Sequence, residues 1–95
     1  MTSREQAIPT QQIDNERVIV TRWQFAPGAE TGWHRHEFDY VIIPGVDGKL
    51  LLQDDEGERV AELSAGVSYF REAGIEHNVI NANDYPFFFV EVELR

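Results

Sequence analysis

Short apolar runs alternate with turn-forming residues along most of the chain. After residue 16, Gly, Pro, Asp or Asn interrupts the apolar positions every eight to twelve residues, and no segment keeps the apolar spacing of an amphipathic helix. The runs predict seven strands, at 18–25, 33–43, 49–53, 59–63, 67–71, 77–81 and 87–94. This pattern is typical of an all-β sandwich or barrel.

The beginning of the chain lacks this periodicity. Residues 1–16 are mostly polar, and we expect them to form an N-terminal arm or an edge strand that becomes ordered on a partner. Residues 17–95 then form a single domain. With 95 residues, 42% of them hydrophobic, the chain is long enough for one core and too short for two.

The last run, FFFVEVEL, is apolar on both faces of a strand. Alternation places four apolar residues on one face: Phe88, Val90, Val92 and Leu94. Phe87 and Phe89 fall on the other face, beside two glutamates. Because exposed neighbouring phenylalanines are unfavourable on a monomer, this second face indicates either a subunit interface or a β-bulge that exchanges the two faces.

Composition and charge exclude several classes of partner. Seventeen acidic and eight basic residues give a net charge of −9, which repels nucleic acids and anionic membranes. The absence of cysteine excludes disulfides, thiolate ligands and thiol catalysis, and suits a cytoplasmic protein. The first residues, MTSREQAIPT, lack the apolar region of a signal peptide, and no run is long enough to span a membrane. We therefore expect a soluble, cytoplasmic chain with neither kind of partner.

Two of the three histidines, His34 and His36, stand one residue apart in the second apolar run. In a strand their β-carbons would lie on one face, roughly 7 Å apart, and both imidazoles could reach one metal ion about 2.1 Å from each nitrogen. The same alternation turns Tyr40 toward the histidines and Glu37 and Asp39 away. Either acid would reach such a metal only if a β-bulge turned it inward.

The third histidine stands in a second ordered context, GVSYFREAGIEHNVIN. Four residues in it are regularly spaced: Gly66, Gly74, His77 and Asn81. The two stretches resemble the two motifs of the cupin family, G-x5-H-x-H-x3,4-E-x6-G and G-x5-P-x-G-x2-H-x3-N. The first corresponds to residues 28–45, with a glycine near its expected end at Gly45, and the second to 66–81; all three histidines stand at the family's histidine-ligand positions.

Two positions depart from these motifs. Glu72 stands at the proline of the second motif, a change that we expect only to alter a turn. Tyr40 stands where the first motif has its glutamate ligand, so that a neutral phenol replaces a carboxylate.

The resemblance implies a double-stranded β-helix, a jelly-roll barrel of two antiparallel sheets, with a divalent metal ion on His34, His36 and His77. Fe, Ni, Zn, Mn, Co and Cu remain candidates, because ligand type alone does not choose among them. Three neutral ligands leave the ion its full charge, so we expect a small, anionic ligand. Since cupins of this size commonly pair, we also expect a homodimer, with the N-terminal arm and the Phe87/Phe89 face as candidate contacts.

Strand alternation outlines a mostly apolar substrate pocket around these histidines. Ile42 continues the inward face of the first stretch, and Val79 and Asn81 continue that of the second. Asn81 is also expected to fix a loop by side-chain hydrogen bonds. Tyr40 is the candidate catalytic residue, orienting substrate or moving a proton; its alternative role is to line the barrel. No Lys or Arg stands at these positions, so a phosphorylated substrate is not expected.

Three functions remain open. Three facial ligands with open metal positions resemble the non-haem iron oxygenases, and some cupin dioxygenases use three histidines; this implies a metal-dependent dioxygenase acting on a small organic acid, diketone or thiol. The chain also resembles small bacterial cupins associated with amino-acid or β-alanine degradation, which implies a non-enzymatic ligand-binding or accessory protein. A metal-assisted isomerase or lyase is less favoured, because Tyr40 is the only other titratable residue that alternation places in the pocket.

Overall fold

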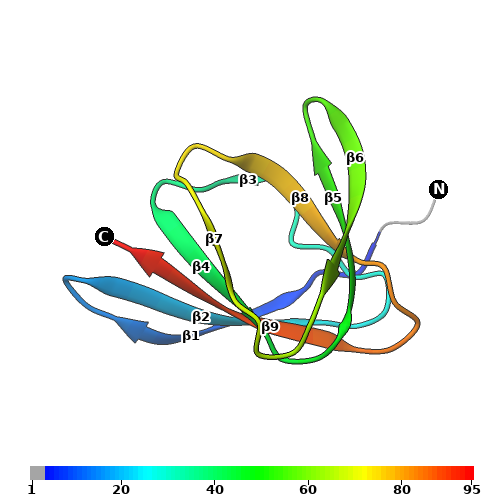
Figure 1. The fold of residues 1–95 in the computed structure, drawn as a ribbon, viewed down its shortest axis with the longest axis horizontal. Coiled ribbons are helices and arrows are strands. Elements are labelled where there is room, and N and C mark those ends of the chain that lie inside the picture. Colours follow the sequence, from blue (N-terminus) through cyan, green and yellow to red (C-terminus); the bar gives the residue numbers. More distant parts are fainter. Residues whose placement is uncertain (1–3) are drawn as a thin grey trace.

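The structure, a computed structural model that describes residues 4–95, consists of two facing antiparallel sheets (Figure 1). Nine strands occur in this range: β1 (Ile8–Asp14), β2 (Val18–Phe25), β3 (His34–Arg35), β4 (Asp39–Pro44), β5 (Gly48–Asp54), β6 (Gly57–Leu63), β7 (Tyr69–Arg71), β8 (Glu76–Asn81) and β9 (Phe87–Leu94). None of the described residues forms a helix that could cross a membrane.

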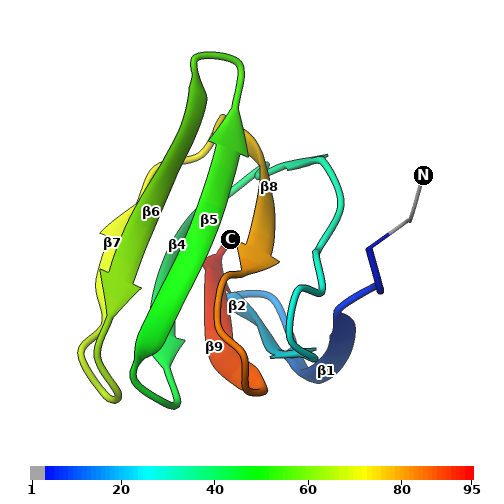
Figure 2. The same cartoon turned by 90° about the vertical axis from the view of Figure 1, so that its right-hand side faces the viewer.

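The strand order confirms the jelly-roll fold expected from the sequence. One sheet has the order β1-β2-β9-β4-β7 and the other has β3-β8-β5-β6. From β2 onward the chain changes sheet at every connection except the β5–β6 hairpin. Figure 2 shows β5 and β6 side by side, with their turn extending beyond the other strands. Because of the repeated crossing, residues far apart in the sequence meet between the sheets.

The first correction to the predicted strands concerns the run at 33–43, which is not one strand. It divides into β3 and β4, which belong to different sheets. His36 lies between them, and its backbone N–H donates to the carbonyl of Ile75 at 2.9 Å while its own carbonyl accepts from Gly74 at 2.8 Å. These hydrogen bonds hold His36 against the loop that precedes β8, and the chain crosses to the other sheet between His36 and Asp39.

The second correction concerns the Phe87/Phe89 face of β9. Both phenylalanines are buried between the sheets, whereas Phe88 and Val90 are half-buried on the outer face. The pairing of β9 with β2 runs from Val18–Leu94 to Phe25–Phe87 without irregularity. Neither a subunit interface nor a β-bulge therefore explains this face. The homodimer itself stays a prediction, without that contact.

The N-terminal segment is an edge strand of the same chain. Strand β1 is exposed along its whole length and pairs with β2, so its partner is intramolecular. The side-chain oxygen of Asn15 accepts the N–H groups of Arg17 at 2.8 Å and Val18 at 2.9 Å, which closes the β1–β2 turn. Ahead of β1, the N–H of Ala7 donates to the carbonyl of Glu30 at 2.8 Å.

Asn81 joins the two sheets at the end of β8. Its side chain is 2% exposed and donates to the carbonyls of Ala26 at 3.2 Å and Tyr85 at 2.9 Å, while its oxygen accepts from the N–H of Asn83 at 2.9 Å. Its backbone carbonyl accepts from Gly28, whose φ of 76° lies in the left-handed region that favours glycine. The two motifs are thus hydrogen-bonded to each other.

Replacing Asn81 with alanine should destabilise the fold strongly. The substitution leaves buried carbonyl and N–H groups without partners, and we expect a loss of about 3 kcal/mol in the free energy of unfolding, or roughly 15 °C in the melting temperature. Chemical denaturation measures the change. Asn15→Ala, in an exposed turn, is the matched control and should lose about 1 kcal/mol or less. Equal losses in both variants would contradict the role assigned to Asn81.

Candidate metal centre

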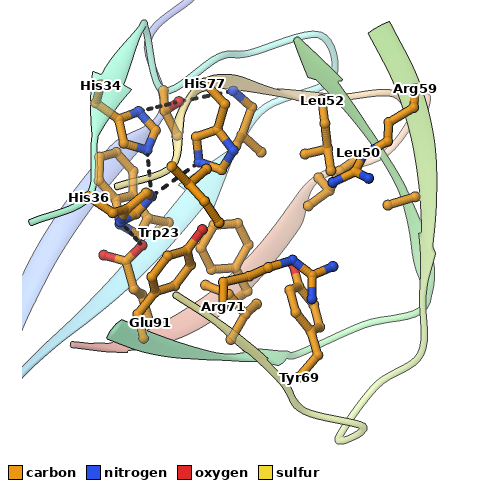
Figure 3. A pocket seen from close by; sticks show the side chains of 17 residues that line it. Trp23, His34, His36, Leu50, Leu52, Arg59, Tyr69, Arg71, His77 and Glu91 are labelled. Atoms are coloured by element: carbon orange, nitrogen blue, oxygen red, sulfur yellow. Dashed lines mark hydrogen bonds and ion pairs between the residues drawn. The ribbon is translucent and has the colours of Figure 1, made fainter. Parts of the chain in front are cut away.

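The pairing of two short strands brings the histidines together. His34 in β3 lies directly opposite His77 in β8, and His36 follows just after the end of β3. The Nε2 atom of His36 is 3.0 Å from Nε2 of His34 and 3.1 Å from Nε2 of His77 (Figure 3). The three imidazoles from the two motifs therefore turn the same ring nitrogen toward a common point.

These separations fit one transition-metal ion. Nitrogens about 2.1 Å from an ion are about 3.0 Å apart at right angles and about 3.4 Å apart in a tetrahedron. The observed 3.0 and 3.1 Å match neighbouring positions of an octahedron. An octahedral ion with three such ligands keeps three further positions open to a substrate.

The outer ring nitrogens have partners that suit this arrangement. Nδ1 of His34 is 2.8 Å from the carbonyl of Gly32, so we assign its proton to this atom, which leaves the Nε2 lone pair free for a metal. Nδ1 of His36 lies 4.0 Å from a carboxylate oxygen of Glu91. Metal-binding histidines in proteins typically have such carbonyl and carboxylate neighbours.

Burial keeps two of the imidazoles neutral. It lowers the pKa of His36 to about 3, with the neighbouring His34 and His77 adding to the shift. Burial, followed by the neighbouring His34, lowers the pKa of His77 to about 4, although Asp54 acts in the opposite direction. At neutral pH both side chains can therefore bind a metal ion without first losing a proton.

Tyr40 lies against the histidines, on the side that alternation predicts. Its ring stacks on that of His36 with 3.9 Å between centroids and 17° between planes. Burial, and secondarily Tyr69 and Glu91, raise the pKa of Tyr40 well above its usual value, so its hydroxyl stays protonated. Asp39 is instead exposed and accepts the N–H of Ala73 at 2.8 Å.

The histidines and Tyr40 line a cavity of about 50 Å³ between the sheets. Ile42 and Val79 line it, as expected from alternation. Asn81 does not, because its side chain is occupied by the loop hydrogen bonds at the end of β8. Glu37, like Asp39, is exposed outside the cavity.

Four charged or titratable residues of the cavity wall were missed by the sequence analysis: Arg59, Tyr69, Arg71 and Glu91. They come from β6, β7 and β9, whereas the predicted pocket residues come only from the two stretches that contain the histidines. Two premises are therefore wrong: Tyr40 is not the only titratable residue beside the histidines, and the cavity does contain arginines. The expectation against a phosphorylated substrate loses this support and stays a prediction. A signal was present, because Arg59 shares its strand face with Ala61 and Leu63.

Glu91 supplies a carboxylate from the strand beside Tyr40. It pairs with Ile42 across β4 and β9 and is 8% exposed. Burial, followed by the nearby Glu93, raises its pKa to about 7, although a hydrogen bond with Trp23 acts in the opposite direction. A buried carboxyl group from outside both motifs thus lies behind His36, on its Nδ1 side.

Comparison with known proteins decides the family. A model of the cupin domain matches residues 21–93. The chain belongs to the cupin family. It is 60% identical to the β-alanine degradation protein BauB of Pseudomonas aeruginosa, over 100% of both chains.

Among solved structures, a cupin domain from Bordetella pertussis is 57% identical, with a TM-score of 0.98 over 100% of this chain and 99% of the other. A protein with a double-stranded β-helix domain from Klebsiella pneumoniae is 24% identical, with a TM-score of 0.78. The match covers 99% of this chain and 81% of the other, and at this identity it shows the fold alone.

The raised pKa of Glu91 gives the metal-free cupin a defined pH dependence. Because the folded pKa of about 7 exceeds the ordinary value of 4.5, Glu91 contributes stability that is fully present below pH 4.5 and is lost as pH rises to 7. The stability of wild type relative to Glu91→Gln should therefore fall across this interval and stay constant above it. Denaturation of both proteins at a series of pH values measures the difference. The exposed Glu16→Gln should show no such fall, and a pH-independent difference for Glu91→Gln would contradict the assignment.

Proposed function

We propose that this cupin binds one divalent transition-metal ion through His34, His36 and His77 and acts as a non-haem dioxygenase on a small organic acid. The observation that carries the proposal is the convergence of three Nε2 atoms, 3.0 and 3.1 Å apart, in a cavity between the sheets. An ion held by three histidines supplies Lewis-acid chemistry and, when it is iron, dioxygen chemistry at its open positions.

The residues around the ligands have separate roles in this proposal. The protonated Tyr40 hydroxyl makes no hydrogen bond to another residue in 4–95, so it is free to donate one to bound substrate. Glu91 orients the ring of His36 from behind. Apolar side chains of Ile42, Leu50 and Val79 keep the cavity small and limit the water it admits.

We place this activity in β-alanine breakdown, because BauB, which is 60% identical over the full length of both chains, is named for that pathway. A name that gives a pathway and no reaction also supports the second candidate, an accessory protein that binds a small ligand without turning it over. The two candidates share the metal ion and the cavity. They differ in whether the loaded protein consumes oxygen.

Metal analysis tests the ligand set. After loading and removal of excess metal, we expect about one ion per chain in the wild type, and at least a 100-fold weaker affinity in His77→Gln, because two ligands remain. Elemental analysis together with a competition titration measures both quantities. Glu37→Gln should bind as the wild type does. Full metal content in His77→Gln, or a loss in Glu37→Gln, would contradict the proposed ligands.

Oxygen uptake tests the dioxygenase. With iron bound and a panel of small carboxylic acids, diketones and thiols, the wild type should consume oxygen, and Tyr40→Phe should do so at least about tenfold more slowly at the same iron content. The phenylalanine keeps the stacking on His36 and removes only the hydroxyl. No uptake with any compound, despite binding of one of them, would favour the accessory role.

A further inference from the structure

Two arginines of the cavity wall have no acidic partner. The ion pairs of Lys and Arg within residues 4–95 are Arg4–Glu30, Lys49–Glu62 and Arg95–Asp14. Arg59 and Arg71 take part in none of them, although acidic residues outnumber basic ones by seventeen to eight in the chain. Two guanidinium groups thus line the cavity without a carboxylate of the protein to neutralise them.

The sheets direct both side chains inward. Arg71 pairs with Tyr40 across β7 and β4, and Arg59 pairs with Leu52 across β6 and β5. Tyr40 and Leu52 line the same cavity. Figure 3 shows the two guanidinium groups on the Tyr69 and Leu50 side of the cavity, across from the three histidines. Cations and candidate metal ligands therefore occupy opposite sides of one small space.

Arg71 is held in place before any ligand arrives. Its guanidinium carbon lies 4.6 Å from the ring centroid of Tyr69, and one nitrogen donates to the carbonyl of Phe70 at 3.0 Å. Arg59 is exposed and Arg71 is half-buried, which places Arg59 nearer the solvent. A guanidinium has five N–H donors in a planar fork that matches a carboxylate. Arg71 therefore keeps donors free for an oxyanion.

Little negative charge opposes the two arginines. Glu91 is the only acidic residue that lines the cavity within the described part of the chain, and it lies behind His36. The cavity is thus positive inside a protein of net charge −9, which favours anions there.

We propose that Arg59 and Arg71 form a carboxylate-binding subsite, and that the substrate is a small carboxylate whose second donor group points to the three histidines. The position of the second group rests on the proposed metal site; the carboxylate subsite does not. A cavity of about 50 Å³ with walls such as Leu50, Leu52 and Ala61 fits a short carbon chain and is too small for a phosphorylated sugar or a nucleotide.

The same charges disfavour an amino acid as the substrate. A zwitterion would bring an ammonium group into a space that already contains two guanidinium groups and, when loaded, a divalent cation. A carboxylate without the amino group avoids this repulsion. A reaction that removes the amino group of an amino acid yields a carboxylate of this kind.

Calorimetric titration of the metal-loaded protein with simple probes tests the subsite. Malonate should bind more tightly than propionate, which lacks a second donor; both should bind at least about tenfold more tightly than propionamide or β-alanine. Arg71→Gln should lower the affinity for malonate about tenfold or more, and Arg59→Gln should also lower it. Arg71→Lys should bind malonate more tightly than Arg71→Gln but less tightly than the wild type. Arg17→Gln, an exposed arginine in the β1–β2 turn, is the matched control and should have no effect.

The metal content of each variant separates this proposal from the proposed function. If Arg71→Gln and Arg59→Gln bind malonate like the wild type at full metal content, the subsite is wrong and the metal site stands. If no protein binds metal but propionate binding still depends on both arginines, the subsite stands and the proposed function fails. Inorganic phosphate binding as tightly as malonate, or β-alanine binding as tightly as propionate, would overturn the assigned ligand class. Thermal denaturation of every variant shows whether it is folded.

Discussion

The site depends on one short strand pairing. Strand β3 contains only two residues, yet its pairing with β8 sets His34 directly opposite His77. His36 follows, held by backbone hydrogen bonds to Gly74 and Ile75, and its Nε2 atom lies 3.1 Å from Nε2 of His77. The convergence therefore depends on a two-residue strand pairing and on the backbone hydrogen bonds that hold His36 beside it.

The rest of the barrel supports this pairing and sets its chemistry. Asn81 ties the end of β8 to the loop after β2, and Tyr40 packs flat against His36 from β4. Glu91 from β9 and Arg71 from β7 bring charges of opposite sign to the same cavity. One sheet thus contributes His34, His77 and Arg59, and the other contributes Arg71, with nitrogen ligands on one side of the cavity and guanidinium groups on the other.

The sequence predicts the parts of this site that lie within its two motifs. Alternation over two residues correctly places His34 and His36 side by side, because it depends only on local backbone geometry. The face of Phe87 and Phe89 was misjudged, because the two glutamates on it resemble those of an exposed face. In the structure this face is buried, and one of these glutamates, Glu91, lines the polar cavity. Contacts of the other strands depend on the crossing of the chain between the sheets, which no local pattern encodes.

X-ray absorption spectroscopy of the cupin loaded with one equivalent of Fe(II) or Co(II) tests the central claim most directly. The account predicts imidazole nitrogens as the protein ligands, three per ion at about 2.1 Å, with the remaining positions taken by lighter oxygen donors that small carboxylates replace. A spectrum with fewer than three imidazoles, or one unchanged in His77→Gln, would contradict it.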